Sequence, residues 1–354
     1  MTSSSPPSRR PRLTRSAVLA AAALVGGALL TACGAGSDAG AARADGLDVV
    51  ASTTVYADIA EQVTGGNATV TAVISDPTAD PHSYEASPAD AAAVAAADLV
   101  VYNGGGYDSF VDRALGAADQ VPVVRAVDEF ARVTGQAPPG HSAGDSEGAP
   151  RGHQHDDHAA GTNEHVWFSP TTAAAVAERL ADDLALIDPG NAEQYRGNAR
   201  RFADALAPLE ARLDAIHDRG RFAYAQTERI GAHLFDAAGM VDRTPRGFLS
   251  AIEDDTDPSA ADLAATRDLI TEGQVAFLAF NTQTETPVTA RLRVAAEQTG
   301  LVVVDLAETL PEGTGYLTWI TGVVGSVTAA LDGATPFATP FDTPAATPST
   351  GDGH

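Results

Sequence analysis

The chain has 354 residues, of which 44% are hydrophobic, and its formal net charge at pH 7 is -25. This length and composition predict a globular protein with room for two domains. So acidic a surface repels phosphate backbones, which excludes nucleic acid as an expected partner.

The first residues have the composition of a secretory signal. Arginines precede an apolar stretch from Ala17 to Leu30, which is too short and too rich in Ala and Gly to predict a membrane span. The sequence Leu30-Thr31-Ala32-Cys33 is similar to a bacterial lipobox, whose cysteine is lipidated and begins the mature protein. Because Cys33 is the only cysteine, neither an internal disulfide nor a multi-cysteine metal site is possible. We therefore expect a lipoprotein signal peptide over residues 1–32, a lipid anchor on Cys33 and a flexible tether over residues 33–46.

Residues 47–190 predict an N-terminal α/β lobe. Helical segments alternate with strand-like runs at 47–51, 69–74, 98–102 and 121–126. Such alternation is typical of a mainly parallel sheet with helices on both faces. Residues 134–164 interrupt this pattern with a loop rich in His, Asp, Gly and Pro, which predicts a functional or disordered segment.

One long connecting helix is predicted over residues 191–218. It carries a single apolar stripe at three-, four- and seven-residue steps, made of Tyr195, Phe202, Leu206, Leu209, Leu213 and Ile216. A second α/β lobe is expected over 219–332, with strand-like runs at 222–225, 275–280 and 301–306. Residues 333–354 repeat Thr-Pro units, which predicts an extended, disordered tail. The predicted fold class is α/β, with two Rossmann-like lobes whose sheets are mainly parallel.

Two histidines stand out because each lies in a segment stiffened by proline. His82 comes after a predicted strand and before a helix that opens with Ser87-Pro88-Ala89-Asp90, a favourable N-terminal cap. That position is the carboxyl edge of a sheet, where α/β proteins bind ligands. His165 lies between the polar loop and the sequence Val166-Trp167-Phe168-Ser169-Pro170. We take both histidines as candidate metal ligands.

The segments 80–90 and 164–170 resemble the first and second metal-ligand motifs of the zinc/manganese solute-binding lipoproteins of ABC importers. Residues 188–192, with Tyr195 and Asn198, resemble the segment that opens the connecting helix in that family. The resemblance implies a monomeric receptor, held on the outer face of the cell membrane, without enzymatic activity. Its expected cargo is Mn²⁺ or Zn²⁺, captured between the lobes and delivered to an ABC importer permease.

The resemblance also implies two ligands from the C-terminal lobe, in addition to His82 and His165. Counting back from Gly239-Met240 places Glu228 at the third ligand position, with His233 as the competing choice. Glu308 matches the fourth position, where most members of the family carry Asp, and Asp305 is the earlier alternative.

The expected ligands do not decide between the two metals. Carboxylates that bind through both oxygens suit manganese, whereas the affinity order of divalent ions favours zinc. Four histidines in the polar loop lie among acidic residues and could bind zinc, or could belong to a solvated linker: His141, His153, His155 and His158. The alternatives are therefore a zinc-specific receptor that uses this loop, a surface adhesin, or a secreted metallohydrolase. A hydrolase would need an open coordination position and a general base, and the sequence has no His-Glu-x-x-His motif.

Overall fold

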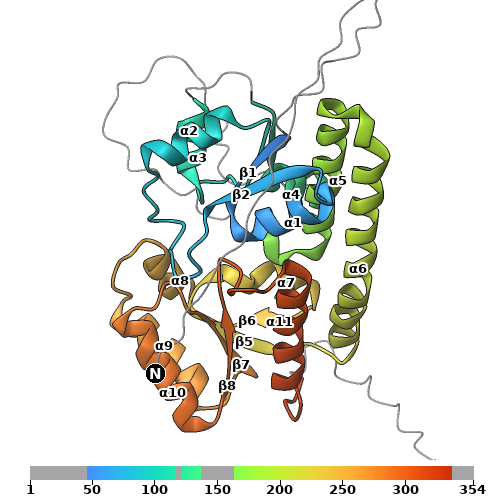
Figure 1. Ribbon diagram of the computed structural model, residues 1–354. Helices are drawn as coiled ribbons and strands as arrows, with labels where there is room; N and C mark the ends of the chain where they lie inside the picture. The colour runs from blue at the N-terminus through green and yellow to red at the C-terminus, as the bar shows by residue number, and fades with distance from the viewer. Residues whose placement is uncertain (1–45, 117–120, 137–162, 337–354) are drawn as a thin grey trace, which may run out of the picture. The chain divides into compact units, whose positions relative to one another are not determined.

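The structure, a computed structural model, describes residues 46–116, 121–136 and 163–336. These residues fall within one compact unit, Asp45–His354. They form two sheets of four parallel strands with helices packed around each sheet (Figure 1), which confirms the predicted α/β fold class. Among the helices of the described ranges, none is long and apolar enough to cross a membrane. Residues 1–32, Cys33 and most of the Thr-Pro tail lie outside the described residues.

The first sheet has the strand order β2-β1-β3-β4, and every neighbouring pair is parallel. Its strands are β1 (Leu47–Thr53), β2 (Ala68–Ile74), β3 (Leu99–Tyr102) and β4 (Val123–Arg125). The helices that follow them are α1 (Thr54–Thr64), α2 (Pro88–Ala96), α3 (Ser109–Leu115) and α4 (Ala126–Thr134). β2 is added on one side of β1, and β3 and β4 are added on the other side, so the order of connection changes between β1 and β3. In sheets of this kind, ligands bind near that point, at the carboxyl ends of the strands.

The second sheet repeats this topology with the order β6-β5-β7-β8. Its strands are β5 (Ala223–Gln226), β6 (Val241–Asp242), β7 (Phe277–Asn281) and β8 (Val302–Leu306). Its helices are α7 (Ala232–Ala237), α8 (Arg246–Glu253), α9 (Ala260–Thr271), α10 (Pro287–Thr299) and α11 (Tyr316–Ala330). The sequence pattern did not predict β6, α3, α4 or α8, because two to nine residues are too few for a clear periodicity.

Two helices connect the two sheets and pack against each other in antiparallel orientation (Figure 1): α5 (Pro170–Ile187) and α6 (Ala192–Asp218). The apolar stripe predicted for the long helix is buried along its whole length. It belongs to one apolar cluster that includes residues of β1 and β3 from the first sheet and of β7 and β8 from the second. The lobes therefore share a core, which limits how far one can move relative to the other.

This shared core yields a stability prediction. Leu206 on the α6 stripe is 1% exposed, whereas Leu186 at the end of α5 is 80% exposed. We expect Leu206→Ala to lower the free energy of unfolding by about 2–5 kcal/mol, because the lost side chain leaves a cavity in the core. The matched control, Leu186→Ala, should change it by less than about 0.5 kcal/mol. Urea denaturation followed by circular dichroism measures both values, and equal effects would contradict the packing described here.

Candidate metal centre

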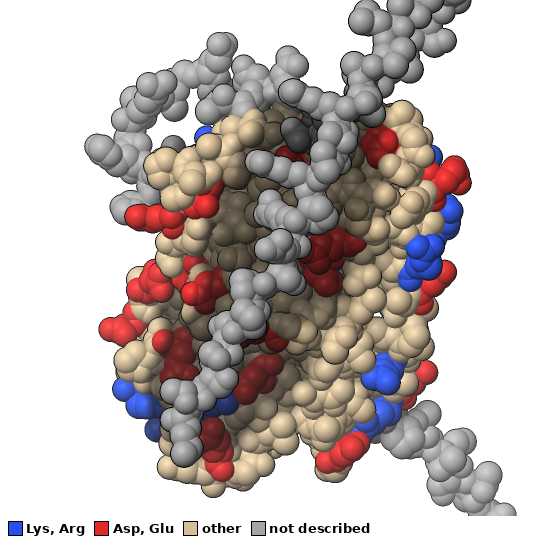
Figure 2. All heavy atoms as spheres, in the orientation of Figure 1, with Lys and Arg blue, Asp and Glu red and all other residues tan. Residues whose placement is uncertain are grey.

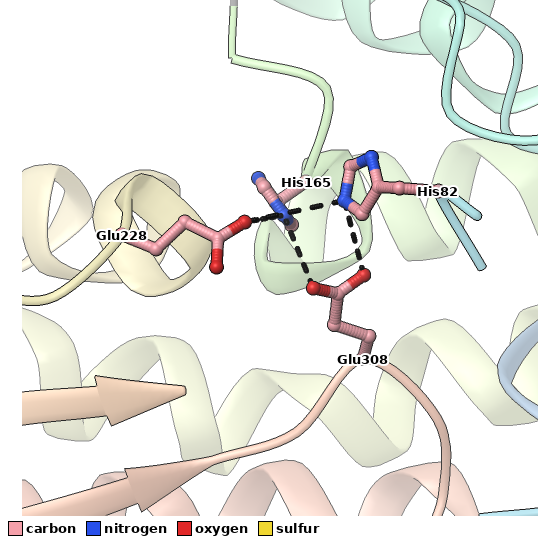
Figure 3. Close-up of side chains that lie close together, drawn as sticks. All are labelled: His82, His165, Glu228 and Glu308. Carbon is pink, nitrogen blue, oxygen red and sulfur yellow. Dashed lines mark ion pairs between the residues drawn. The ribbon is translucent and has the colours of Figure 1, made fainter. Parts of the chain in front are cut away.

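Four side chains from separate parts of the chain converge on one point (Figure 3). His82 lies between β2 and α2, and His165 precedes the short 3-10 helix η1 (Val166–Phe168). Glu228 follows β5, and Glu308 follows β8. One ligand atom of each lies within 4.8 Å of those of the other three. The structure thus brings together the four residues that the sequence motifs and the resemblance singled out.

The distances between these atoms are close to those that a bound metal ion requires. His82 Nε2 lies 3.3 Å from Glu308 Oε2 and 4.0 Å from Glu228 Oε1. His165 Nε2 lies 3.7 Å from Glu228 Oε1 and 3.9 Å from Glu308 Oε1. Bonds of roughly 2.0–2.1 Å to zinc would place tetrahedral ligands roughly 3.4 Å apart. The cluster is slightly wider than this, so small side-chain shifts suffice to close it around an ion.

Local hydrogen bonds and ring contacts hold His82 in place. The Asp80 side chain accepts from the backbone N–H of His82 at 2.9 Å and from the Ser83 hydroxyl at 2.8 Å, a turn that aspartate favours. The ring of Tyr107 stands edge-on to that of His82, with their centroids 4.9 Å apart. The side chain of His82 is 27% exposed, whereas those of the other three residues are nearly inaccessible. His82 therefore marks the side from which an ion can enter.

His165 is oriented so that one ring nitrogen is free to bind a metal. Asn163 Oδ1 accepts from the backbone N–H of His165 at 3.0 Å and lies 2.7 Å from its Nδ1. This contact requires a hydrogen on Nδ1, which leaves the lone pair on Nε2 directed at the carboxylates. Burial lowers the pKa of His165 well below its usual value, and the charges of His82, His233 and Arg229 act in the same direction. His165 is therefore neutral near pH 7, as a metal ligand must be.

The two carboxylates lie close together and out of water. Burial raises the pKa of Glu228 to about 8, and the neighbouring charge of Glu308 adds to this effect. Burial alone would lower the pKa of His82, but its contact with Glu308 and the charge of that carboxylate raise it to about 10. Without a metal, the cluster therefore retains protons on His82 and Glu228 at neutral pH.

Two buried atoms of the cluster have no hydrogen-bond partner among the described residues, Nε2 of His165 and Oε2 of Glu308, and of these Oε2 has an ion-pair contact with His82 Nε2 at 3.3 Å. Buried polar atoms are normally satisfied, so the unpaired Nε2 of His165, 3.7 Å from Glu228 Oε1 and 3.9 Å from Glu308 Oε1, indicates a missing ligand. Two imidazole nitrogens and two carboxylates neutralise a divalent cation and are accepted by both zinc and manganese. The residues present therefore fit a divalent transition metal.

The alternative ligands lie elsewhere. The ring of His233 contacts that of Phe130 at a tilt, with centroids 4.6 Å apart, and its Nε2 lies 3.0 Å from the carbonyl oxygen of Asn163. It thus supports the loop that carries His165 instead of facing the cluster. Asp305 points to solvent on β8, where it pairs with Arg293 at 2.8 Å. The loop histidines His141, His153, His155 and His158 lie outside the described residues.

Three side chains that support the cluster were missed by sequence reasoning. Asn281 Nδ2 donates to Glu228 Oε2 at 2.7 Å and to Glu308 Oε1 at 2.8 Å. The Thr284 hydroxyl donates to Glu228 Oε2 at 2.6 Å. Gln283 donates to the carbonyl oxygens of Pro77 and Ala79 in the loop before His82, and it accepts from the backbone N–H of Glu308. The one available signal was a run of polar residues directly after a buried strand, β7.

The raised pKa of Glu228 has a consequence for the metal-free protein. The unfolded chain has the ordinary glutamate pKa, so the buried carboxylate destabilises the fold increasingly as pH rises from 4.5 towards 8. We expect Glu228→Gln to raise the free energy of unfolding at pH 8 by up to about 4 kcal/mol, at roughly 1.4 kcal/mol per unit of pKa shift, with little effect near pH 4. Chemical denaturation of metal-stripped protein measures this difference. The exposed Glu210→Gln is the control, and a stability loss for Glu228→Gln at pH 8 would contradict the electrostatic account.

Known proteins share this chain's sequence pattern and fold. The family described as "Zinc-uptake complex component A periplasmic" (ZnuA) matches residues 49–330. The zinc-binding lipoprotein AdcA of Streptococcus pneumoniae is 26% identical over 242 residues, which cover 67% of this chain but only 46% of AdcA. The manganese-binding lipoprotein MntA of Bacillus subtilis is 26% identical over 263 residues, covering 73% of this chain and 78% of MntA.

A solved structure has the same fold. The Mn-bound periplasmic metal-binding protein from Candidatus Liberibacter asiaticus superposes with a TM-score of 0.58 at 19% identity, covering 80% of this chain and 99% of the other. The family match, over residues 49–330, spans both sheets and all four residues of the cluster. The chain belongs to the family of periplasmic zinc-uptake component A proteins.

Proposed function

We propose that this protein is the metal-binding receptor of an ABC importer, which captures Mn²⁺ or Zn²⁺ between its lobes and delivers it to the membrane permease. The observation that carries the proposal is the cluster of His82, His165, Glu228 and Glu308, in which the buried Nε2 of His165 has no hydrogen-bond partner among the described residues. The names of the relatives AdcA and MntA, one zinc-binding and one manganese-binding, support the same class of cargo.

The cargo would be bound and released without bond chemistry. Four ligand side chains fill the coordination shell of zinc and leave no position for an activated water, which a hydrolase would require. Acidic side chains are spread over the upper and lower parts of the face in Figure 2. Such a surface raises the local concentration of cations near the site. Because the lobes share a core, we expect release to depend on small local shifts of the ligand segments.

The N-terminal segment indicates how the receptor is attached to the membrane. We propose that residues 1–32 are removed as a signal peptide and that lipid on Cys33 holds the receptor at the outer face of the membrane. The segment 33–46 would then act as a tether to the two lobes, 47–190 and 219–332. These assignments rest on the basic start, the short apolar stretch and the lipobox-like sequence before Cys33.

Substitution of the four proposed ligands tests the site directly. We expect His165→Ala and Glu228→Ala to lower the affinity for Zn²⁺ and Mn²⁺ by at least about 100-fold, because each removes a donor atom from a buried site. His233→Phe, which keeps the ring contact with Phe130, should retain binding within about tenfold. Calorimetric titration of metal-stripped protein measures these affinities. Normal binding by Glu228→Ala would show that the ion is held elsewhere.

Deletion of residues 135–162 tests whether the metal binds at the cluster or at the His-rich loop. We expect tight one-to-one binding to survive this deletion, because none of the four proposed ligands lies in the deleted segment. Calorimetric titration with Zn²⁺ and with Mn²⁺ gives the stoichiometry and affinity for each metal. Selective loss of zinc binding would instead support a zinc receptor that uses His141, His153, His155 and His158.

Metal binding should strengthen as pH rises. The ion competes with protons on His82 and Glu228, whose pKa values are raised to about 10 and about 8 in the metal-free protein. For each proton released, the apparent association constant should increase roughly tenfold per pH unit between about pH 6 and 8. Titrations at several pH values, in buffers of different ionisation enthalpy, give both the affinity and the number of protons released. An affinity independent of pH would argue against direct coordination by these groups.

A further inference from the structure

Asn281 is the side chain through which the two glutamates of the cluster are joined. It ends β7, is 1% exposed, and uses its amide nitrogen to donate to Glu228 Oε2 and Glu308 Oε1. An asparagine amide nitrogen carries two hydrogens, so these two bonds use both. The residue therefore contacts one oxygen of each carboxylate at the same time.

The orientation of this amide is fixed by bonds on its other side. Asn281 Oδ1 accepts from the backbone N–H of Gln283 at 3.0 Å, and the backbone N–H of Asn281 donates to the Thr227 hydroxyl at 3.1 Å. A flipped amide would direct its oxygen at two acceptor carboxylates and leave the N–H of Gln283 unpaired. Only one orientation satisfies all these groups, and it directs both hydrogens at the glutamates.

These hydrogen bonds restrain Glu228 more than Glu308. Glu228 Oε2 is held by both Asn281 and Thr284, so Oε1 is the atom that faces the histidines. Glu308 Oε1 accepts one hydrogen bond from Asn281 and lies 3.9 Å from His165 Nε2, while its Oε2 lies 3.3 Å from His82 Nε2, so both oxygens of Glu308 face the histidines. The two hydrogen bonds to Glu228 Oε2 use both of its lone pairs, so Glu228 offers an ion Oε1 alone unless one of these bonds breaks.

We propose that Asn281, assisted by Thr284, is a specificity-determining residue that restrains Glu228 to one metal-binding oxygen and so favours zinc over manganese. This inference rests on the function proposed above. Zinc is satisfied by four nitrogen and oxygen ligands, whereas manganese takes octahedral shells of six. If Glu228 Oε2 is released, this carboxylate can bind through two oxygens, which raises the coordination number and favours manganese.

The test is a comparison of metal selectivity in the purified full-length protein after metal removal. Zn²⁺ and Mn²⁺ are titrated separately and in competition for the wild type, Asn281→Ala and Thr284→Val. Asn198→Ala is the matched control, since Asn198 is also buried but donates its amide hydrogen to the carbonyl oxygen of Val63 in α1. We expect the ratio of zinc to manganese affinity to fall about tenfold or more in Asn281→Ala. Thr284→Val should shift it less in the same direction, and Asn198→Ala should leave it unchanged.

Cobalt(II) provides a readout that a merely structural role would not change. The visible d–d bands of four-coordinate cobalt are much more intense than those of six-coordinate cobalt. We expect intense bands in the wild type and weaker bands in Asn281→Ala. Equal weakening of zinc and manganese binding, with an unchanged cobalt spectrum, would overturn the role of Asn281 while leaving the proposed function intact.

Two further outcomes are decisive. If Asn281→Ala does not fold, Thr284→Val carries the test, because Thr284 is only partly buried and the change preserves its shape. An unchanged selectivity and cobalt spectrum in that variant would then overturn the proposal. If the wild type itself binds neither metal, the proposed function fails, and the specificity inference fails with it.

Discussion

The burial of two glutamates and one uncharged histidine against one another is the constraint on which the rest of the structure depends. Glu308 is fully buried, and Glu228 and His165 are nearly so. Carboxylates placed side by side away from water lose their hydration and repel each other, which costs several kcal/mol unless other groups compensate. Asn281, Thr284 and Asn163 supply part of that compensation through hydrogen bonds. A divalent cation would supply the rest, because its charge balances both carboxylates.

The fold makes this arrangement possible by bringing the carboxyl edges of two similar sheets together. His82 follows β2 of the first sheet, while Glu228 and Glu308 follow β5 and β8 of the second. Hydrogen bonds between the lobes fix the position of one edge relative to the other. The side-chain amide of Gln283 donates to backbone carbonyl oxygens in the loop before His82, and the hydroxyl of Tyr316 donates to the carbonyl oxygen of Trp167 at 2.7 Å. A shared apolar core reinforces these bonds. The geometry of the ligands is therefore largely set before an ion arrives, which lowers the ordering cost of binding.

Sequence patterns predict features that depend on residues near one another in the chain, and they do not predict contacts between residues that are far apart in it. The two sheets, the long helix and the histidines His82 and His165 were predictable, because alternation, apolar periodicity and proline-stiffened segments are local signals. Glu228 and Glu308 needed the family resemblance, since an acid after a strand has no distinctive spacing of its own. The role of Asn281 could not be predicted. Its amide matters only because β5, β7 and β8 bring two distant glutamates to its side.

The central claim is that one divalent ion binds between the lobes at these four side chains. Anomalous diffraction from crystals of the protein loaded with Zn²⁺ or Mn²⁺ tests it most directly, because the anomalous signal locates each metal without assumptions about its ligands. The account predicts one strong peak within bonding distance of Nε2 of His82, Nε2 of His165 and the carboxylates of Glu228 and Glu308. A cluster without a peak, with the metal bound at other residues, would contradict it.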